Sequence, residues 1–351
     1  MKLTIGGFSH GEKLTGIVDG VPAGLKIDEK IIAQDLFLRR GGKERSVRQT
    51  KEFDKFKITG GLFKGKTTGA NIAFEIENIC GSTFNGKKYE VRAGHADFCG
   101  IKKYGITAEE VMESASARLT ACTVFAGAIA DEVLDKLGVS VTGYVDSVGG
   151  VKAVSFSEEY EALAFQKPLY MPVNSEIALD KIDEARLFGD TLGGTFVIKV
   201  KNLKCGFGSY NGERLSSKYA AALFNVPSVK GVEIGEGFLL ADKKGSDSVD
   251  FFTESGRKTN RAGGIEGGIS DGEDIVLRCA VKPVPTCRLN ETFDLATKKA
   301  GEPSNVRSDV CVVPSAMIVA RAEVSIATLS AVTERLGSDR IADLIKRYKK
   351  L

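Results

Sequence analysis

The sequence lacks long uninterrupted runs of apolar residues. The first seven residues include no stretch apolar enough for a signal peptide. The most apolar segment, residues 310–332, contains Arg321 and Glu323, which predicts a core helix rather than a membrane span. No lipidation motif is visible. We therefore expect a cytoplasmic protein with no membrane partner.

A strong excess of charge of one sign is also missing. Lys and Arg number 49 against 46 for Asp and Glu, so the formal net charge is +3. That excess is too small for a nucleic-acid-binding face, and we predict no nucleic acid partner. Apolar residues make up 42% and charged residues 27%, as in ordinary globular proteins. No Pro/Ser-rich or charge-block segment divides the chain, which favours one domain over residues 1–351.

Paired cysteines are absent as well. The seven cysteines are odd in number and contain no CxxC pair, so they fit neither a disulfide framework nor a zinc site. They are Cys80, Cys99, Cys122, Cys205, Cys279, Cys287 and Cys311. We expect reduced thiols, most of them buried, and no bound metal.

Glycine, by contrast, is abundant, with 40 residues gathered in tight clusters that indicate turns. Residues 60–72 align without gaps with residues 263–275, and four glycines and an isoleucine coincide. Two predicted helices, ending at Gly138 and Gly337, are separated by nearly the same offset of roughly 200 residues. We therefore expect two similar halves, approximately residues 1–150 and 190–351, related by a pseudo-two-fold repeat.

Periodicity predicts the principal elements. Apolar residues recur at three- and four-residue steps over 107–137, where Thr107 and Glu110 form a capping box, which predicts one long helix. A second helix is expected over 316–336. Strands are expected over residues 71–77, 194–201 and 274–281.

Residues 60–67 match the Walker A pattern of nucleoside triphosphatases letter for letter. Such a loop must open a helix whose amides hold the phosphates, but the following residues alternate like a strand. The repeat copy at 263–270 keeps the glycines and lacks the lysine. Both facts favour a turn over a nucleotide site. Gly235 and Gly237 are a weaker dinucleotide signal still, because no third glycine follows at the required spacing.

Histidine is scarce, and both examples sit in glycine-flanked loops. His10 lies in residues 6–11, after a predicted strand, and His95 lies in residues 92–97. Loops on rigid elements often carry function. Arginines occur in the same regions and suit phosphate and carboxylate ligands. They are Arg39, Arg45, Arg118 and Arg307.

Several short motifs, taken in order, are similar to those of the chorismate synthase family. Ser9-His10-Gly11 and residues 19–25 resemble the first signature. The second signature resembles residues 94–97, 103–105 and 115–118. The third resembles residues 229–235, 259–260, 263–270 and 282–283. The last resembles Arg307-x-Asp309-x-Cys311-Val312. Each fragment is weak alone, but together they follow the family order over some 300 residues.

The resemblance implies an α+β fold, a β-α-β sandwich of two intertwined, internally duplicated halves, and a homotetramer. It also implies a lyase that converts 5-enolpyruvylshikimate 3-phosphate to chorismate and phosphate, the last common step of the shikimate pathway, with reduced FMN as cofactor. No reductase domain is evident, which favours an external flavin reductase over reduction of FMN by NADPH on this chain.

The resemblance also implies residue roles. His10 would donate a proton or hydrogen bond to the departing phosphate, oriented by Ser9, and His95 would protonate or hold the reduced flavin. Asp309 would help the flavin act as a base toward the ring proton of the substrate. Ser116 would be part of the proton relay. Substrate or flavin anions would be bound by Arg39, Arg45, Arg118 and Arg307. Further cofactor contacts would come from Ser114, Ala115, Ser116, Ser228, Gly267, Lys282, Thr286 and Arg307.

This chain departs from the family pattern at several positions. The family has Glu at Phe8, Pro at Ala93 and Arg at Ser114, and it reads His-Asp-Pro where this chain has residues 308–310. A flavin- or phosphosugar-binding paralogue without lyase activity therefore stays open as the alternative.

Overall fold

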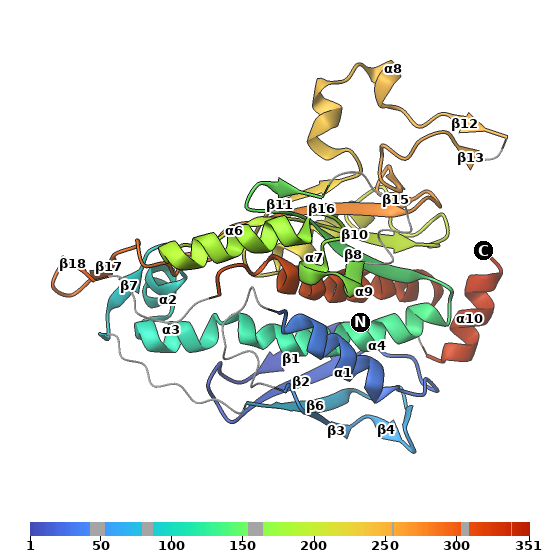
Figure 1. The fold of residues 1–351 in the computed structure, drawn as a ribbon. Helices are drawn as coiled ribbons and strands as arrows, with labels where there is room; N and C mark the ends of the chain where they lie inside the picture. The colour runs from blue at the N-terminus through green and yellow to red at the C-terminus, as the bar shows by residue number, and fades with distance from the viewer. Residues whose placement is uncertain (43–52, 79–86, 154–163, 255, 303–308, 338) are drawn as a thin grey trace.

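The computed structural model describes residues 1–42, 53–78, 87–153, 164–254, 256–302, 309–337 and 339–351. Arg45, Arg307, Ser308 and Cys80 lie outside these ranges. Two antiparallel sheets enclose a layer of helices (Figure 1). The predicted α+β class and β-α-β layering are confirmed.

The first sheet has the strand order β1-β2-β6-β3. Its strands are β1 (Lys2–Gly6), β2 (Lys13–Asp19), β6 (Ile72–Glu77) and β3 (Phe56–Gly60). Along β2, exposed and buried residues alternate, as expected for a strand with one face on the core. Helices α1 (Glu29–Arg39) and α4 (Thr120–Asp135) belong to the layer above this sheet (Figure 1).

The second sheet has the strand order β11-β16-β10-β8-β9. Its strands are β11 (Val229–Ile234), β16 (Ile275–Val281), β10 (Gly194–Lys201), β8 (Ser140–Val148) and β9 (Val151–Lys152). The run β8-β10-β16-β11 follows the same chain order as β1-β2-β6-β3 in the first sheet. Helices α7 (Leu215–Phe224) and α9 (Val313–Leu336) pack against it.

The two sheets are joined through the contact between α4 and α9 at the centre of the molecule. A Cβ atom built on Gly127 of α4 would lie 2.3 Å from the Cβ of Ala322 on α9, so only glycine permits this approach. On the other side of α4, Phe125 stacks on Phe74 of β6 with ring centroids 3.8 Å apart. Most buried apolar residues therefore belong to one cluster that runs from sheet to sheet.

Shorter elements surround this sandwich. A three-stranded sheet consists of β18 (Lys299–Gly301), β17 (Thr292–Asp294) and β7 (Glu90–Arg92). The other helices are α2 (Asp97–Tyr104), α3 (Ala108–Ser114), η2 (Ala117–Leu119), η3 (Ala164–Gln166), η4 (Pro168–Tyr170), α6 (Ser175–Phe188) and α10 (Ile341–Lys349). An arm that projects from the second sheet (Figure 1) contains η5 (Gly237–Asp242), α8 (Gly245–Ser248), β12 (Phe252–Thr253) and β13 (Gly256–Arg257).

The predicted strands agree with β6, β10 and β16 within one residue at each end, and the second predicted helix begins three residues early, at Val313. The single helix predicted over 107–137 is wrong, because it is divided into α3, η2 and α4. Ser116 has an extended ψ of 139°, and its side chain accepts a hydrogen bond from the Arg118 amide. Ser116 thus caps a new helical segment inside the periodic pattern.

The Walker-like residues form a hairpin and open no helix. Strands β4 (Leu62–Phe63) and β5 (Lys66–Thr67) pair with each other and lead into β6. Their repeat copy forms β14 (Ile265–Glu266) and β15 (Ile269–Ser270) in the same register. The interpretation of this segment as a turn is confirmed.

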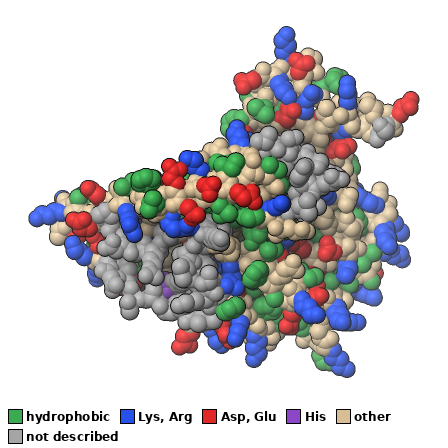
Figure 2. Space-filling view, viewed as in Figure 1, with side chains coloured by type: hydrophobic (Ala, Val, Ile, Leu, Met, Phe, Trp, Pro, Cys, Tyr) green, Lys and Arg blue, Asp and Glu red, His purple; other side chains and the backbone are tan. Residues whose placement is uncertain are grey.

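Helix α9 is long and apolar enough to cross a membrane, but 67% of its most apolar window is buried inside the protein. It is the predicted core helix. The six described cysteines form no disulfide. Three of them, Cys122, Cys279 and Cys311, are buried, so the expectation that most cysteines are buried is wrong for the described residues. Burial raises the pKa of Cys122 and of Cys279 to about 12. On the face shown in Figure 2, basic and acidic side chains of the described residues are interspersed, in keeping with the small net charge.

Candidate active site

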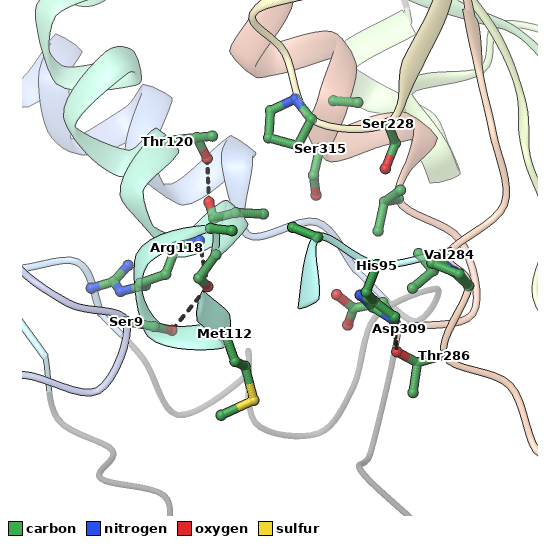
Figure 3. A pocket seen from close by; sticks show the side chains of 18 of the residues that line it. Ser9, His95, Met112, Arg118, Thr120, Ser228, Val284, Thr286, Asp309 and Ser315 are labelled. Carbon is green, nitrogen blue, oxygen red and sulfur yellow. Dashed lines mark hydrogen bonds between the residues drawn. The ribbon is translucent and has the colours of Figure 1, made fainter. Parts of the chain in front are cut away.

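A cavity of about 470 Å³ lies between loops of the two sheets, a volume within the usual range for small-molecule sites. It is lined by residues near the beginnings of both central helices, Thr120 of α4 and Ser315 and Val319 of α9. In Figure 3, Ser9, Arg118 and Met112 occupy one side, and His95, Thr286 and Asp309 the other. Segments from both ends of the chain therefore meet here.

The first histidine lines the cavity in the loop that follows β1. The His10 Nδ1 atom forms a short contact with Glu113 Oε1, and the His10 backbone N–H donates to Glu113 Oε2 at 2.8 Å. Glu113 is in the last turn of α3. Both side chains are mostly buried, with 13% and 19% exposed.

A chain of hydroxyl contacts follows on the same side. The Ser9 hydroxyl donates to Ser116 Oγ at 2.9 Å, and Ser116 Oγ accepts from the Arg118 amide at 3.2 Å (Figure 3). Ser9 is buried, and its backbone N–H donates to the Glu113 carbonyl at 3.1 Å. The break in the predicted long helix thus creates the turn that brings Ser116 to Ser9.

Two buried arginines are held in the cavity wall by one carboxylate. Asp54 pairs with Arg39 Nη2 at 2.8 Å and with Arg118 Nη1 at shorter range. Burial opposes ionisation of Asp54, but the two guanidinium groups outweigh it and lower the pKa of Asp54. Arg118 also donates to Asn78 Oδ1 at 2.7 Å and to the Glu77 carbonyl at 3.0 Å. Two cations and one anion leave one net positive charge in this wall.

The second histidine lies across the cavity. His95 Nε2 is 2.6 Å from the Thr286 hydroxyl (Figure 3). Burial, reinforced by the neighbouring Arg92, lowers the pKa of His95 to about 4, so its imidazole is neutral at pH 7. Arg92 is itself held by a bidentate pair with Asp97, with both N···O distances 2.8 Å.

The loop that carries His95 is pressed against the loop after β16. Gly94 has a φ of +72°, and a Cβ built there would lie 2.7 Å from Pro285 Cβ. Lys282 Nζ donates to the Gly94 carbonyl at 2.8 Å. Only glycine accepts both this backbone conformation and this approach. The contact gathers Lys282, His95 and Thr286 at one wall.

A family model described as chorismate synthase matches residues 1–333. This chain belongs to the chorismate synthase family. A chorismate synthase of Geobacillus kaustophilus (strain HTA426) is 38% identical, with 99% of this chain and 97% of the relative covered. One of Thermotoga maritima is 36% identical, with 99% and 96% covered. A solved structure titled "Crystal Structure of Chorismate Synthase" has a TM-score of 0.81 and 30% identity, over 99% of this chain and 96% of that one.

Chorismate synthases are lyases, and the cavity gathers most of the residues that the resemblance pointed to. It is lined by Ser9, His10, Arg39, His95, Ala115, Ser116, Arg118, Ser228, Lys282, Thr286 and Asp309. Two others are elsewhere: Ser114 is exposed at the end of α3, and Gly267 is at the tip of the β14–β15 hairpin, beside Tyr210. Arg45 and Arg307 fall outside the described residues.

Sequence reasoning missed several residues that line or support this cavity. Arg92, Thr120 and Ser315 line the cavity, and Asp54 and Glu113 hold its arginines and its first histidine. Arg92 was within the quoted motif beside His95 and could have been included. Asp54 and Glu113 carried no signal, because their partners are far along the chain.

Proposed function

We propose that this chain converts 5-enolpyruvylshikimate 3-phosphate to chorismate and phosphate, the last common step of the shikimate pathway, with reduced FMN as cofactor. The observation that carries the proposal is the cavity whose lining includes His10 and His95, the chain's two histidines, together with Arg39, Arg118 and Lys282. An anionic substrate with a phosphate leaving group needs such preorganised cations.

The cavity also suits a flavin. Its lining includes apolar side chains for a flat ring, among them Met112, Val312 and Val319. The buried Ser315 Oγ has no hydrogen-bond partner among the described residues, and the first turn of α9 lacks a side-chain cap. A helix N-terminus with a spare hydroxyl is suited to an anionic ligand group. Ser228, Lys282 and Thr286 would add polar contacts. Reduced FMN, when bound, would supply electron density during the elimination.

The residues would act by binding the anions and moving protons. Arg39 and Arg118 would hold the phosphate, whose C–O bond breaks with the electron pair leaving on oxygen. His10 would pass a proton from Nε2 to that oxygen. The electrons of the broken ring C–H bond form the new double bond, so there is no net oxidation. His95, neutral in the free protein, would gain a proton or donate a hydrogen bond when an anion lies beside it, and Asp309 would assist proton removal.

An anaerobic assay with photoreduced FMN tests this function. We expect phosphate release and chorismate formation without net consumption of reductant. His10→Ala should lower turnover by about two to four orders of magnitude while the fold survives, because His10 lies in a loop. If the wild type releases no phosphate, or needs stoichiometric reductant, the lyase proposal is wrong. Flavin binding without turnover would then favour a paralogue without lyase activity. The departures from the family pattern at Phe8 and Ser114 favour the same alternative.

We also propose that the chain forms a homotetramer and receives reduced flavin from an external reductase. The projecting arm supports an assembly, because Phe238, Leu239, Phe251 and Phe252 are exposed on it. Clustered exposed apolar side chains mark interaction surfaces. Light scattering after size exclusion would give the mass of the assembly, and NADPH without added reductase should sustain no turnover.

A further inference from the structure

Glu113 is the one carboxylate among the described residues that contacts His10 directly. Both of its oxygens are used, one by the ring Nδ1 and one by the His10 backbone N–H at 2.8 Å. Because an ionised carboxylate only accepts hydrogen bonds, a proton on Nδ1 would satisfy this contact. The partner of the ring nitrogen is thus a residue 103 positions away.

Glu113 is itself held firmly. The Ser9 N–H donates to its backbone carbonyl at 3.1 Å, which ties the end of α3 to the loop. The start of α3 is fixed by the Thr107–Glu110 capping box. On the other side of the loop, Asn78 Nδ2 donates to the Gly11 carbonyl at 2.8 Å. The histidine loop is therefore braced from two directions, and the carboxylate is not a solvent-exposed side chain that meets His10 by chance.

We propose that Glu113 is a positioning residue for His10 in the elimination, an inference that rests on the proposed function. It keeps the proton on Nδ1, directs Nε2 to the cavity, and stabilises the doubly protonated ring before the reaction. When the Nε2 proton passes to the phosphate oxygen, the C–O electron pair leaves with phosphate. His10 is then neutral, with its Nδ1–H still donated to Glu113.

Because the Glu113 carboxylate lies beside His10, removing its charge should lower kcat without raising KM. Glu113→Gln removes the stabilising anion, so kcat should fall about 10- to 100-fold, less than when the acid itself is lost. KM for the anionic substrate should not rise, because the change removes a negative charge from its surroundings. A merely structural defect would instead raise KM. Glu109→Gln, on the exposed side of the same helix, is the matched control and should leave both constants unchanged.

Nitrogen NMR of the free protein provides a test that needs no turnover. With only two histidines in the chain, ¹⁵N-histidine labelling gives two imidazole patterns, which a His95→Gln variant assigns. In the wild type at pH 8, His10 should show a protonated Nδ1. Glu113→Met, of similar size without an acceptor, should shift the ring towards the Nε2–H tautomer.

Two results would overturn the role of Glu113: an Nδ1 without a proton in the wild type, or a tautomer and kcat that the substitutions leave unchanged. A wild type without turnover refutes the proposed function and hence the catalytic role of Glu113. The NMR result would in that case still decide whether Glu113 controls the His10 ring.

Discussion

At the scale of single residues, the two histidines differ in what surrounds them. His10 is held by the Glu113 carboxylate, whereas His95 is half-buried beside a cation, Arg92, and its Nε2 contacts the neutral hydroxyl of Thr286. The ring of His95 is thus neutral until an anion approaches, whereas the ring of His10 already has a carboxylate partner. Two histidines that line one cavity therefore differ in their chemistry, because different residues surround them.

The His95 environment predicts a dependence of stability on pH. Its pKa is about 4 in the folded protein and 6.5 in the unfolded chain, so the unfolded chain takes up a proton first as pH falls. The stability associated with the neutral ring is present above pH 6.5 and is lost between pH 6.5 and 4, by about 2–3 kcal/mol. In urea unfolding, the wild type should lose stability relative to His95→Gln as pH falls from 6.5 to 4, and the difference between the two proteins should be constant above pH 6.5. Parallel curves over this range would contradict the prediction.

Ser114 is the departure whose consequence is easiest to measure. Its exposed hydroxyl donates to the Glu110 carbonyl at 2.8 Å, next to Ala115 in the cavity wall. An arginine here would add a permanent charge near a flavin phosphate, worth about 1–3 kcal/mol, or one to two powers of ten in affinity. We expect weak binding of oxidised FMN to the free protein, tighter binding with substrate, and partial recovery in Ser114→Arg. Fluorescence titration measures each affinity, and submicromolar wild-type binding that Ser114→Arg leaves unchanged would refute this account.

At the scale of elements, hairpin β4–β5 shows that a sequence pattern typical of phosphate-binding loops can form a β-hairpin instead. Gly61 and Gly65 have φ values of +88° and +74°, and Thr67 is buried, where its hydroxyl donates to the Pro22 carbonyl at 2.6 Å. Lys66 is exposed on the hairpin. In a nucleoside triphosphatase the threonine of this pattern binds magnesium. In this chain its hydroxyl instead holds the hairpin to the core.

Lys66→Ala should consequently leave turnover within a few-fold of wild type. No ATP dependence should be found in either protein, because the following element is the strand β6 and not a helix with free amides. Isothermal titration with ATP provides the direct measurement. Tight ATP binding that disappears in the variant would restore the nucleotide interpretation.

At the scale of the whole molecule, we infer that the chain is one domain built from two similar halves. The two sheets share a strand order, the two hairpins share a register, and α4 and α9 follow at equivalent places. Strand β8 occupies in the second sheet the place of β1 in the first, so we assign it to the second half. The division then falls near Gly138 rather than between residues 150 and 190.

The contact between α4 and α9 joins these halves, which makes Gly127 a sensitive position. Gly127→Val should lower the free energy of unfolding by about 1–3 kcal/mol or more, because the added atoms meet Ala322 at 2.3 Å. Thermal unfolding measures the loss. The control is Gly245→Ala on the arm, where an added Cβ meets no atom within 4 Å. Equal melting temperatures for wild type and Gly127→Val would show that the helices can separate without cost.

The sequence by itself determined several of the elements and the kinds of side chain available to the site. Apolar period, capping residues and glycine turns predicted β6, β10, β16 and α9, and the order of short motifs identified the family. These signals are readable because each depends on residues close together in the chain.

Only the tertiary structure decided which side chains meet. The contact of Ser9 with Ser116, the pairing of Arg39 and Arg118 through Asp54, and the contact of Glu113 with His10 all join positions that the chain separates. No periodicity encodes such contacts. Their geometry follows from how the two sheets and the helices between them bring these segments to one cavity, and the neutral state of His95 follows from its partial burial there.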